Sequence, residues 1–403
     1  MESVRFSSVD ARSVQYWLLL GALALTALVG YLAAHHMDVE GHHITGMNNQ
    51  VVWGFPHVVA VFLIVAASGS LNVASISSVF GKIDYKPLAR LSGLLAIALL
   101  VGGLIILVLD LGRPDRLIVA MTVYNFKSIF AWNIFLYIGF IVVTFVYLWM
   151  MMERKMNRFV KPAGFIAFIW RLILTTGTGS IFGFLVARQA YDAAIMAPLF
   201  IIMSFAFGLA VFLLVLQASY AGTGRPLGDA ILRKLKILLG IFVAAVLYFV
   251  LAYHLTNLYA TEHHGVEHFV LIGGGIYTFL FWFVQVFAGC VVPLVLIFIK
   301  PFSQSRHMVS VASLLVIVGG MAQLYVIIIG GQAYPLVLFP GMEESSSFFD
   351  GVVAQYAPSI FEILLGAGGI CLALAIVTVG IAVLEFLPES LSDKALKLES
   401  ATT

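Results

Sequence analysis

Residues 110–116 read Asp110-Leu111-Gly112-Arg113-Pro114-Asp115-Arg116 and directly follow the uncharged apolar run 91–109. A run of about 20 apolar residues is long enough to cross a bilayer as a helix. Gly112 and Pro114 predict where that helix ends, because glycine tolerates left-handed backbone and proline cannot continue a helix. Asp110 opposes the negative helix end and needs a compensating partner. Arg113 is the nearest candidate.

Two interpretations of this charged segment stand side by side. In the first, it is an interfacial cap that fixes a turn, since ionisable groups are common at the ends of membrane helices. In the second, it is a hydrogen-bonding wall for a polar headgroup at the membrane boundary. Spacing alone does not separate the two.

The composition defines the class of protein. Of the 403 residues, 62% are hydrophobic and 10% are charged, against about 25% charged in soluble proteins. We predict an all-α integral membrane protein, since a membrane barrel would alternate apolar and polar residues. Ten segments are apolar enough to span: 14–34, 51–80, 88–109, 128–152, 162–186, 194–220, 237–260, 269–299, 309–330 and 358–387.

Lysine and arginine are distributed unevenly about these segments. Of the 22 such residues, 17 fall in the termini and in loops on the same side, and four fall on the opposite side. This excess predicts that both termini are cytoplasmic and that the helix count is even. We expect a multi-pass protein of a bacterial inner membrane, with lipid around it. The net charge of +2 gives no reason to expect a nucleic-acid partner.

Polar residues inside the predicted helices need a reason, because water is absent there. At about 100° per residue, the second helix aligns His57, Ser68, Asn72 and Ser75 on one face. The serines are ordinary in helix packing, whereas an imidazole can pass protons. A path for protons is therefore one hypothesis, with these members: Ser68, Asn72, Ser75, Arg171, Thr175 and Glu362.

Three short motifs resemble one known family. Trp53-Gly54-Phe55-Pro56-His57 opens a helix, Leu107 to Pro114 closes another, and Asn125-Phe126-Lys127-Ser128 opens the next. Together they resemble the polysulfide reductase membrane-subunit family, also called NrfD-like. Residues 66–130 are most similar to members that serve as membrane subunits of the Dsr complex in sulfur-metabolising bacteria.

The resemblance implies a fold of two four-helix bundles with one peripheral helix at each end. The expected divisions are 1–50, the first helix and a histidine-rich outer loop; 51–193, the first bundle; 194–331, the second bundle; and 332–403, the last outer loop, last helix and tail. It also implies a quinone site in the first bundle near the outer face. Carried over by motif, that site comprises Trp53, His57, Asp110, Arg113, Tyr124, Asn125, Lys127 and Ser128.

The family's function implies a subunit of a respiratory oxidoreductase rather than a stand-alone enzyme. Menaquinone or ubiquinone would be the bound substrate, in anaerobic respiration linked to sulfur metabolism. Expected partners are an extracytoplasmic iron–sulfur subunit and, as further candidates, a cytochrome c subunit and other membrane subunits. The chain holds two cysteines, and an iron–sulfur cluster takes four ligands, so no cluster of its own is expected.

Three alternatives remain open, and one of them is a purely structural anchor without a quinone site. His57 and His254 have similar predicted depth on different helices and could together ligate a b-type haem. A secondary transporter would show broken helices at matched positions in two halves. The glycines at 177, 179 and 273–275 interrupt helices without a convincing pairing.

Overall fold

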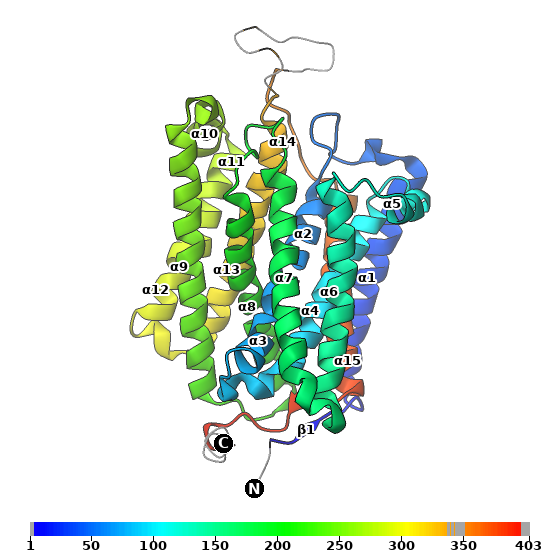
Figure 1. Cartoon of the computed structure of the whole chain (residues 1–403), viewed down its shortest axis with the longest axis vertical. Coiled ribbons are helices and arrows are strands. Elements are labelled where there is room, and N and C mark those ends of the chain that lie inside the picture. The colour runs from blue at the N-terminus through cyan, green and yellow to red at the C-terminus, as the bar shows by residue number, and fades with distance from the viewer. Residues whose placement is uncertain (1–3, 337–338, 340–341, 343–350, 396–403) are drawn as a thin grey trace.

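The computed structural model describes residues 4–336, 339, 342 and 351–395, so part of the predicted 332–403 segment lies outside the described residues. Within this described part, ten helical stretches are long and apolar enough to span a membrane, as the sequence predicted (Figure 1). The spanning stretches consist of α1 (Val14–Glu40), α2 (Phe55–Ser70) with α3 (Asn72–Ser78), α4 (Ala89–Leu109), α6 (Ile129–Met152), α7 (Val160–Gly183), α8 (Met196–Thr223), α9 (Asp229–Tyr259), α11 (Ile276–Phe279) with η7 (Leu280–Val291) and α12 (Val292–Phe298), α13 (Arg306–Tyr325) with η9 (Val326–Gly330) and α14 (Gly331–Ala333), and α15 (Ile360–Val383).

Short helices connect the spans. They are η1 (His42–Ile44), η2 (Ile83–Leu88), η3 (Pro114–Arg116), α5 (Leu117–Thr122), η4 (Arg154–Phe159), η5 (Thr261–His263), α10 (His264–His268), η6 (Phe269–Gly273) and η8 (Phe302–Gln304). Most of them cap or bend the ends of the spans. Three elements, η6, η7 and η9, are π-helical, a rare and wider form of helix.

The spans fall into neighbouring groups. The α2–α3 span packs against α4 and α7, α6 lies between α4 and α7, and α8, α9, α12 and α13 pack together on the other side. The first and last spans, α1 and α15, pack on each other and reach the rest through the contacts of α15 with α4 and α2. This arrangement is compatible with two bundles and two peripheral helices, while the residue limits of those divisions stay a prediction.

The two groups meet where α2 crosses α8. A Cβ atom added to Gly69 would overlap the carbonyl of Ser204, and one added to Gly208 would overlap the backbone of Gly69. Glycine at both positions lets the two backbones touch, as small residues do between membrane helices. The crossing fixes α2 at the centre of the molecule, where it is more buried than any other described span.

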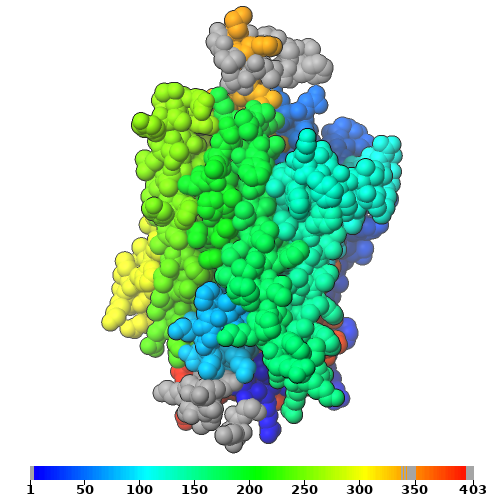
Figure 2. All heavy atoms as spheres, viewed as in Figure 1, coloured from blue at the N-terminus to red at the C-terminus, as the bar shows by residue number. Residues whose placement is uncertain are grey.

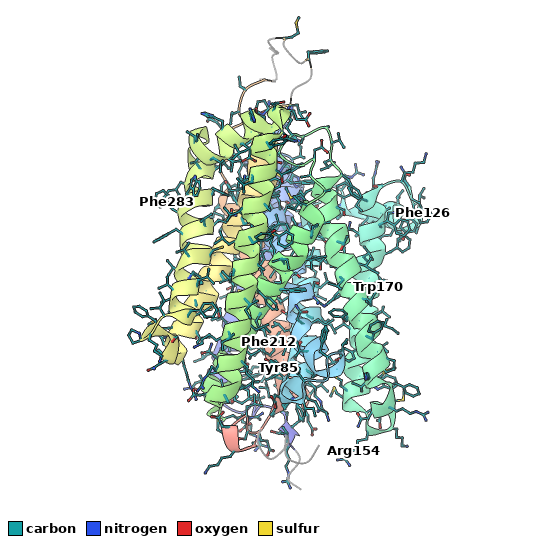
Figure 3. The ribbon with its side chains drawn as sticks, turned by 60° about the vertical axis from the view of Figure 1, so that its left-hand side comes forward. Tyr85, Phe126, Arg154, Trp170, Phe212 and Phe283 are labelled. Atoms are coloured by element: carbon teal, nitrogen blue, oxygen red, sulfur yellow. The ribbon has the colours of Figure 1, made fainter. Side chains whose placement is uncertain are left out.

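The outer surface of the helices is apolar, as lipid contact requires. Phe126 and Phe283 project away from the helices at the two margins in Figure 3 and are each 61% exposed. On the face seen in Figure 1, the space-filling view shows side chains closing the space between the ribbons (Figure 2). Exposed aromatic and aliphatic residues of this kind agree with a molecule surrounded by acyl chains.

Both ends of the described chain lie at one end of the molecule. The strand β1 (Phe6–Ser7) pairs in antiparallel fashion with β2 (Leu387–Pro388), and the labels N and C in Figure 1 lie at that end. An even number of spans requires this placement. We call the opposite end, which carries His42, Asp110 and Glu267, the distal face.

Candidate functional site

The carboxyl group of Asp110 lies at the distal end of α4 between two histidines. Its backbone N–H donates to Ile106 at 3.0 Å and closes the last turn of the helix. The Asp110 side chain is fully buried; its Oδ2 lies 3.0 Å from Nδ1 of His57 and its Oδ1 lies 3.8 Å from Nε2 of His42. We call Asp110, His57 and His42 the His–Asp cluster.

The structure gives Asp110 different partners from the one expected. Arg113 pairs instead with Asp115, with Nε and Oδ1 3.1 Å apart, and both of those side chains are more than 60% exposed. The reason is the backbone at Gly112, whose φ of +49° turns the chain away from Asp110. The imidazole of His42 packs against Gly112, 3.4 Å from where a Cβ would be. His42 thus occupies the position that we expected Arg113 to fill.

The contacts within the His–Asp cluster favour the charged forms of Asp110 and His42. Burial raises the pKa of the Asp110 carboxyl, but the contacts with His42 and His57 outweigh burial and hold the pKa below its usual value. The contact with Asp110 raises the pKa of His42, against an opposing effect of burial. Both directions indicate that Asp110 is ionised and that His42 takes up a proton readily.

Aromatic rings surround the accessible side of His57, whose side chain is 20% exposed. Trp53 stacks on it with ring centres 6.2 Å apart and an interplanar angle of 18°. Trp53 in turn meets the edges of Phe130 and Phe182 at 5.9 and 6.0 Å. Among the residues described, Nε2 of His57 makes no hydrogen bond, so this atom is free to bind a ligand.

The loop 41–54, which carries His42 and leads to Trp53, is fixed by the C-terminal part of the chain. Oε1 of Gln332 accepts from the N–H groups of Val52 and Trp53, each at 3.0 Å, and its Nε2 donates to the carbonyl of Trp53 at 3.0 Å. Glu362, which is fully buried, accepts from the Gly46 N–H at 2.8 Å. No local pattern in the sequence predicts these pairings, because the partners lie about 280 to 316 residues apart.

Tyr356 links the same loop to the beginning of α15. Its hydroxyl donates to Oε1 of Glu362 at 2.7 Å and accepts from the Phe55 N–H at 2.6 Å. Glu362 also accepts from the Ser359 N–H at 2.7 Å, and the two residues form a capping box at the N-terminus of α15. Glu362 is therefore a saturated acceptor near the distal face.

The turn 124–128 lies at the surface beside this cluster. Tyr124 packs on Phe135 with ring centres 4.3 Å apart, and Oδ1 of Asn125 accepts from the Lys127 N–H at 3.1 Å. Ser128 precedes α6 without capping it through its side chain. The connection to the cluster runs through Phe130, which touches Trp53; no direct bond joins this turn to His57 or Asp110 among the described residues.

The remaining polar stripe is only partly connected. Oγ of Ser68 lies 2.6 Å from Oγ1 of Thr175 and 3.2 Å from the carbonyl of Arg171. Ser75 donates to Leu71 of its own helix turn. The nitrogens of the Arg171 guanidinium, like Nδ2 of Asn72, are buried without a hydrogen-bond partner in the described part of the chain. The guanidinium lies 4.9 Å from the ring centres of both Phe168 and Phe205.

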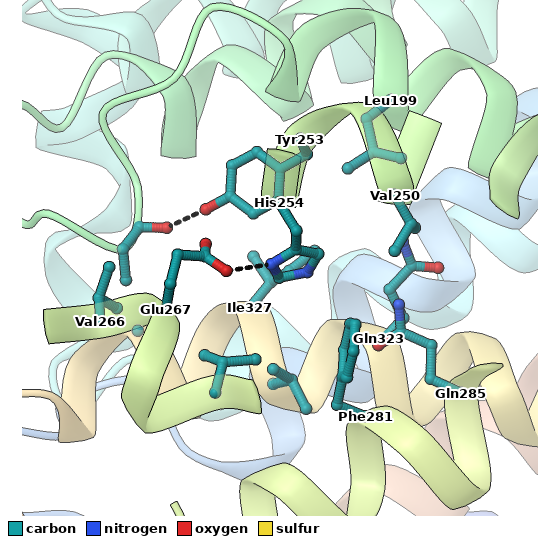
Figure 4. A pocket seen from close by; sticks show the side chains of 14 residues that line it. Leu199, Val250, Tyr253, His254, Val266, Glu267, Phe281, Gln285, Gln323 and Ile327 are labelled. Atoms are coloured by element: carbon teal, nitrogen blue, oxygen red, sulfur yellow. Dashed lines mark hydrogen bonds and ion pairs between the residues drawn. The ribbon is translucent and has the colours of Figure 1, made fainter. Parts of the chain in front are cut away.

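His254 belongs to a separate site in the second group of helices. Its Nδ1 lies 2.7 Å from Oε2 of Glu267 (Figure 4), whereas Nδ1 of His57 faces Asp110. The two histidines share no contact within the described residues, and no grouping there could hold a metal ion through three His, Cys, Asp or Glu side chains. A haem between His57 and His254 stays a prediction.

Fold and site together define a multi-pass, all-α membrane protein with a buried carboxylate–histidine cluster beneath its distal face. The sequence profile described as "Polysulphide reductase, NrfD" matches residues 43–335. The chain belongs to this family, as the motifs around His57 and Asp110 predicted.

Several named relatives align with most of this protein. The "Hdr-like menaquinol oxidoreductase integral membrane subunit" of Archaeoglobus fulgidus is 28% identical over 395 residues, which cover 96% of this chain and 98% of the relative. A selenate reductase subunit of Mesobacillus selenatarsenatis is 23% identical, with 89% and 92% covered. A polysulfide reductase subunit of Wolinella succinogenes is 25% identical, with 71% and 96% covered.

Proposed function

We propose that this chain is the quinone-interacting membrane subunit of a multi-subunit oxidoreductase. It would exchange electrons between the membrane quinone pool and a partner at the distal face. The observation that carries the proposal is the His–Asp cluster, in which a buried carboxylate meets a partly exposed imidazole under an aromatic wall. Membership of the family and the relative named as a menaquinol oxidoreductase subunit support it.

The proposed role of the His–Asp cluster is to accept protons from the quinol. Oxidation of a quinol to a quinone releases two electrons, which leave for the partner, and two protons. His57 is placed to accept one proton, since Nε2 is free while Asp110 holds Nδ1 and stabilises the imidazolium that forms. His42, whose pKa Asp110 raises, offers a second acceptor. Trp53 supplies a flat face for the quinone ring.

The turn 124–128 is the proposed second contact for the headgroup. Tyr124, Asn125, Lys127 and Ser128 stay in the proposed site as residues at the rim, since Phe130 joins their segment to Trp53. Arg113 stays as the exposed cation that follows Asp110 in the chain. In this arrangement Asn125 or Lys127 would hydrogen-bond the quinone oxygen farther from His57. The exposed position of these side chains suits a ligand that enters from the lipid.

The same proposal extends to the orientation of the protein in the membrane, to its partner subunit and to a path for protons. We place the termini in the cytoplasm of a bacterial inner membrane, because lysine and arginine gather on that side. An iron–sulfur subunit with a role in sulfur metabolism would then dock on the distal face. The polar stripe from Ser68 to Ser75, with Arg171 and Thr175, would carry protons across; Glu362, bound by three donors, would act only at its distal end.

A substitution at His57 tests the assignment of the site. The complex is purified from its own membranes through a tag on this chain, and oxidation of a menaquinol analogue is followed with an artificial electron acceptor. His57→Gln should lower kcat about 100-fold or more, the usual effect of removing a general base. The matched control is His43→Gln, which changes an exposed histidine of the loop 41–54 that precedes α2. Equal rates in the two variants would place the quinone elsewhere.

A further inference from the structure

The second group of helices contains another buried carboxylate–histidine pair, Glu267 with His254. Oε2 of Glu267 lies 2.7 Å from Nδ1 of His254, and its Oε1 accepts from Nδ2 of Asn257 at 2.9 Å. The Glu267 residue is only 2% exposed. A carboxyl group buried to this extent needs polar partners, and His254 and Asn257 supply them.

A cavity adjoins this pair. It has a volume of ≈ 40 Å³, counted as space open to the centres of water molecules. A cavity needs at least about 10–15 Å³ to hold a water, so this one is large enough for ordered water. The polar lining comes from Glu267, His254, Gln285 and Gln323, and the rest is apolar (Figure 4). Water in a cavity with two to four polar partners is ordered and retained.

The cavity is surrounded by irregular helix. All three π-helical elements contribute to its wall: Val270 from η6, Phe281 and Gln285 from η7, and Val326 and Ile327 from η9. In the described part of the chain, the elements that carry the His–Asp cluster, which are α2, η1 and the end of α4, contain no π-helix. Widened turns are frequently found at functional sites, so their concentration here supports a ligand site.

The cavity extends toward the middle of the membrane. Gln285 and Gln323 also line a second, smaller space of ≈ 10 Å³ that continues to Gly289 and Gly319. The two glutamines therefore separate a compartment at the Glu267–His254 pair from one deeper in the helices. Both amides can donate to and accept from water.

From the pair, the cavity and the π-helices we infer a hydrated proton-binding site in the second group of helices. Its ligands are water and a proton shared between Glu267 and His254. Tyr253 of α9 is a further titratable group facing Glu267, and its hydroxyl donates to the Ala190 carbonyl at 2.8 Å. Arg188, the nearby cation of the α7–α8 connection, is engaged by the carbonyls of Gln332 and Gln50. This inference needs neither a quinone nor the His–Asp cluster.

Infrared difference spectroscopy of the full-length protein in lipid nanodiscs tests the inference without a quinone. In the wild type, a pH change should produce a carboxyl signal that shifts in D2O, because water reaches the group. The signal should be lost in Glu267→Gln and kept in Glu262→Gln, the control, whose carboxylate lies in the neighbouring η5 and is 75% exposed.

Two results would overturn the inference: a wild-type spectrum identical to that of Glu267→Gln, or a carboxyl signal with the same frequency in H2O and D2O. Should Glu267→Gln fail to fold, His254→Gln gives the answer, because it keeps the carboxylate and removes its titratable partner. That variant should change the pH dependence of the signal, and an unchanged pH dependence would count against the shared proton. Failure here would leave the quinone proposal standing, since no step of the test involves the His–Asp cluster.

Discussion

At the scale of single residues, charge in this protein is organised by burial rather than by nearness in the sequence. Asp110 and Arg113 are three residues apart, yet Asp110 faces His57 and His42 while Arg113 faces the exposed Asp115. A surface pair such as Arg113–Asp115 contributes little. A buried carboxylate, in contrast, requires its partners, and this one selects histidines from α2 and η1.

The His42–Asp110 contact predicts a pH window for its contribution to stability. Because the pKa of His42 is raised, that contribution is complete below about pH 6.5, the unfolded value, and is lost as the pH rises through the folded pKa. Because the pKa of Asp110 is lowered, its contribution is present above about pH 3.9 and is lost as the pH falls through the folded pKa.

His42→Gln should therefore lower the melting temperature most at about pH 5 and least at about pH 9. The measurement is thermal unfolding in detergent across this range, with His43→Gln as the control. A destabilisation that is the same at both pH values would mean that the charge on His42 is not responsible.

At the scale of elements, the crossing of α2 and α8 depends on glycine. Gly208→Ala would place a methyl group into the backbone of Gly69 and Ser70. We expect a loss of about 1–3 kcal/mol, the usual cost of overpacking. Gly222 lies on the same helix with nothing within 4 Å of its added Cβ, so Gly222→Ala should be neutral or slightly stabilising. The measurement is thermal unfolding of both variants. Equal melting temperatures would show that the crossing tolerates the methyl group.

The loop 41–54 is a second element whose position depends on one residue. Glu362→Ala would remove the acceptor of the Gly46 and Ser359 N–H groups and of the Tyr356 hydroxyl. A buried donor left without a partner costs roughly 1–3 kcal/mol, so we expect a loss of at least about 2 kcal/mol. Faster proteolysis within 41–54 should accompany it. Glu40→Ala, at the exposed end of α1, is the control and should leave both measurements unchanged.

At the scale of the whole molecule, the even number of spans fixes only that the described ends share one side. Which side this is can be tested with reporter fusions. A fluorescent protein fused to either terminus should fold and fluoresce, since we place the termini in the cytoplasm. Alkaline phosphatase inserted after His43 should be active, because that enzyme requires the oxidising compartment outside. The reverse pattern would invert the proposed topology and, with it, the side on which the partner docks.

Much of the architecture was predictable because its signals are local. Length and hydropathy give each span, and the ten predicted segments correspond to the ten described helical stretches. The ends were less predictable: α1 continues to Glu40 and α9 begins at Asp229, beyond the apolar runs, since the helix hydrogen-bond pattern continues into polar residues at the interface. The π-helical turns around Gln285 were not predicted from the hydrophobic periodicity of the sequence.

The sequence by itself determined that this chain is a multi-pass, all-α membrane protein, belongs to a particular family and carries that family's motifs around His57 and Asp110. Those properties depend on composition, run length and motif, which are fixed along the chain. The tertiary structure alone decided that Asp110 meets His42, that Glu362 holds Gly46 and that Glu267 meets His254. These contacts depend on helix crossings and on a turn at Gly112, and burial makes each carboxylate take the partner that the packed helices bring within reach.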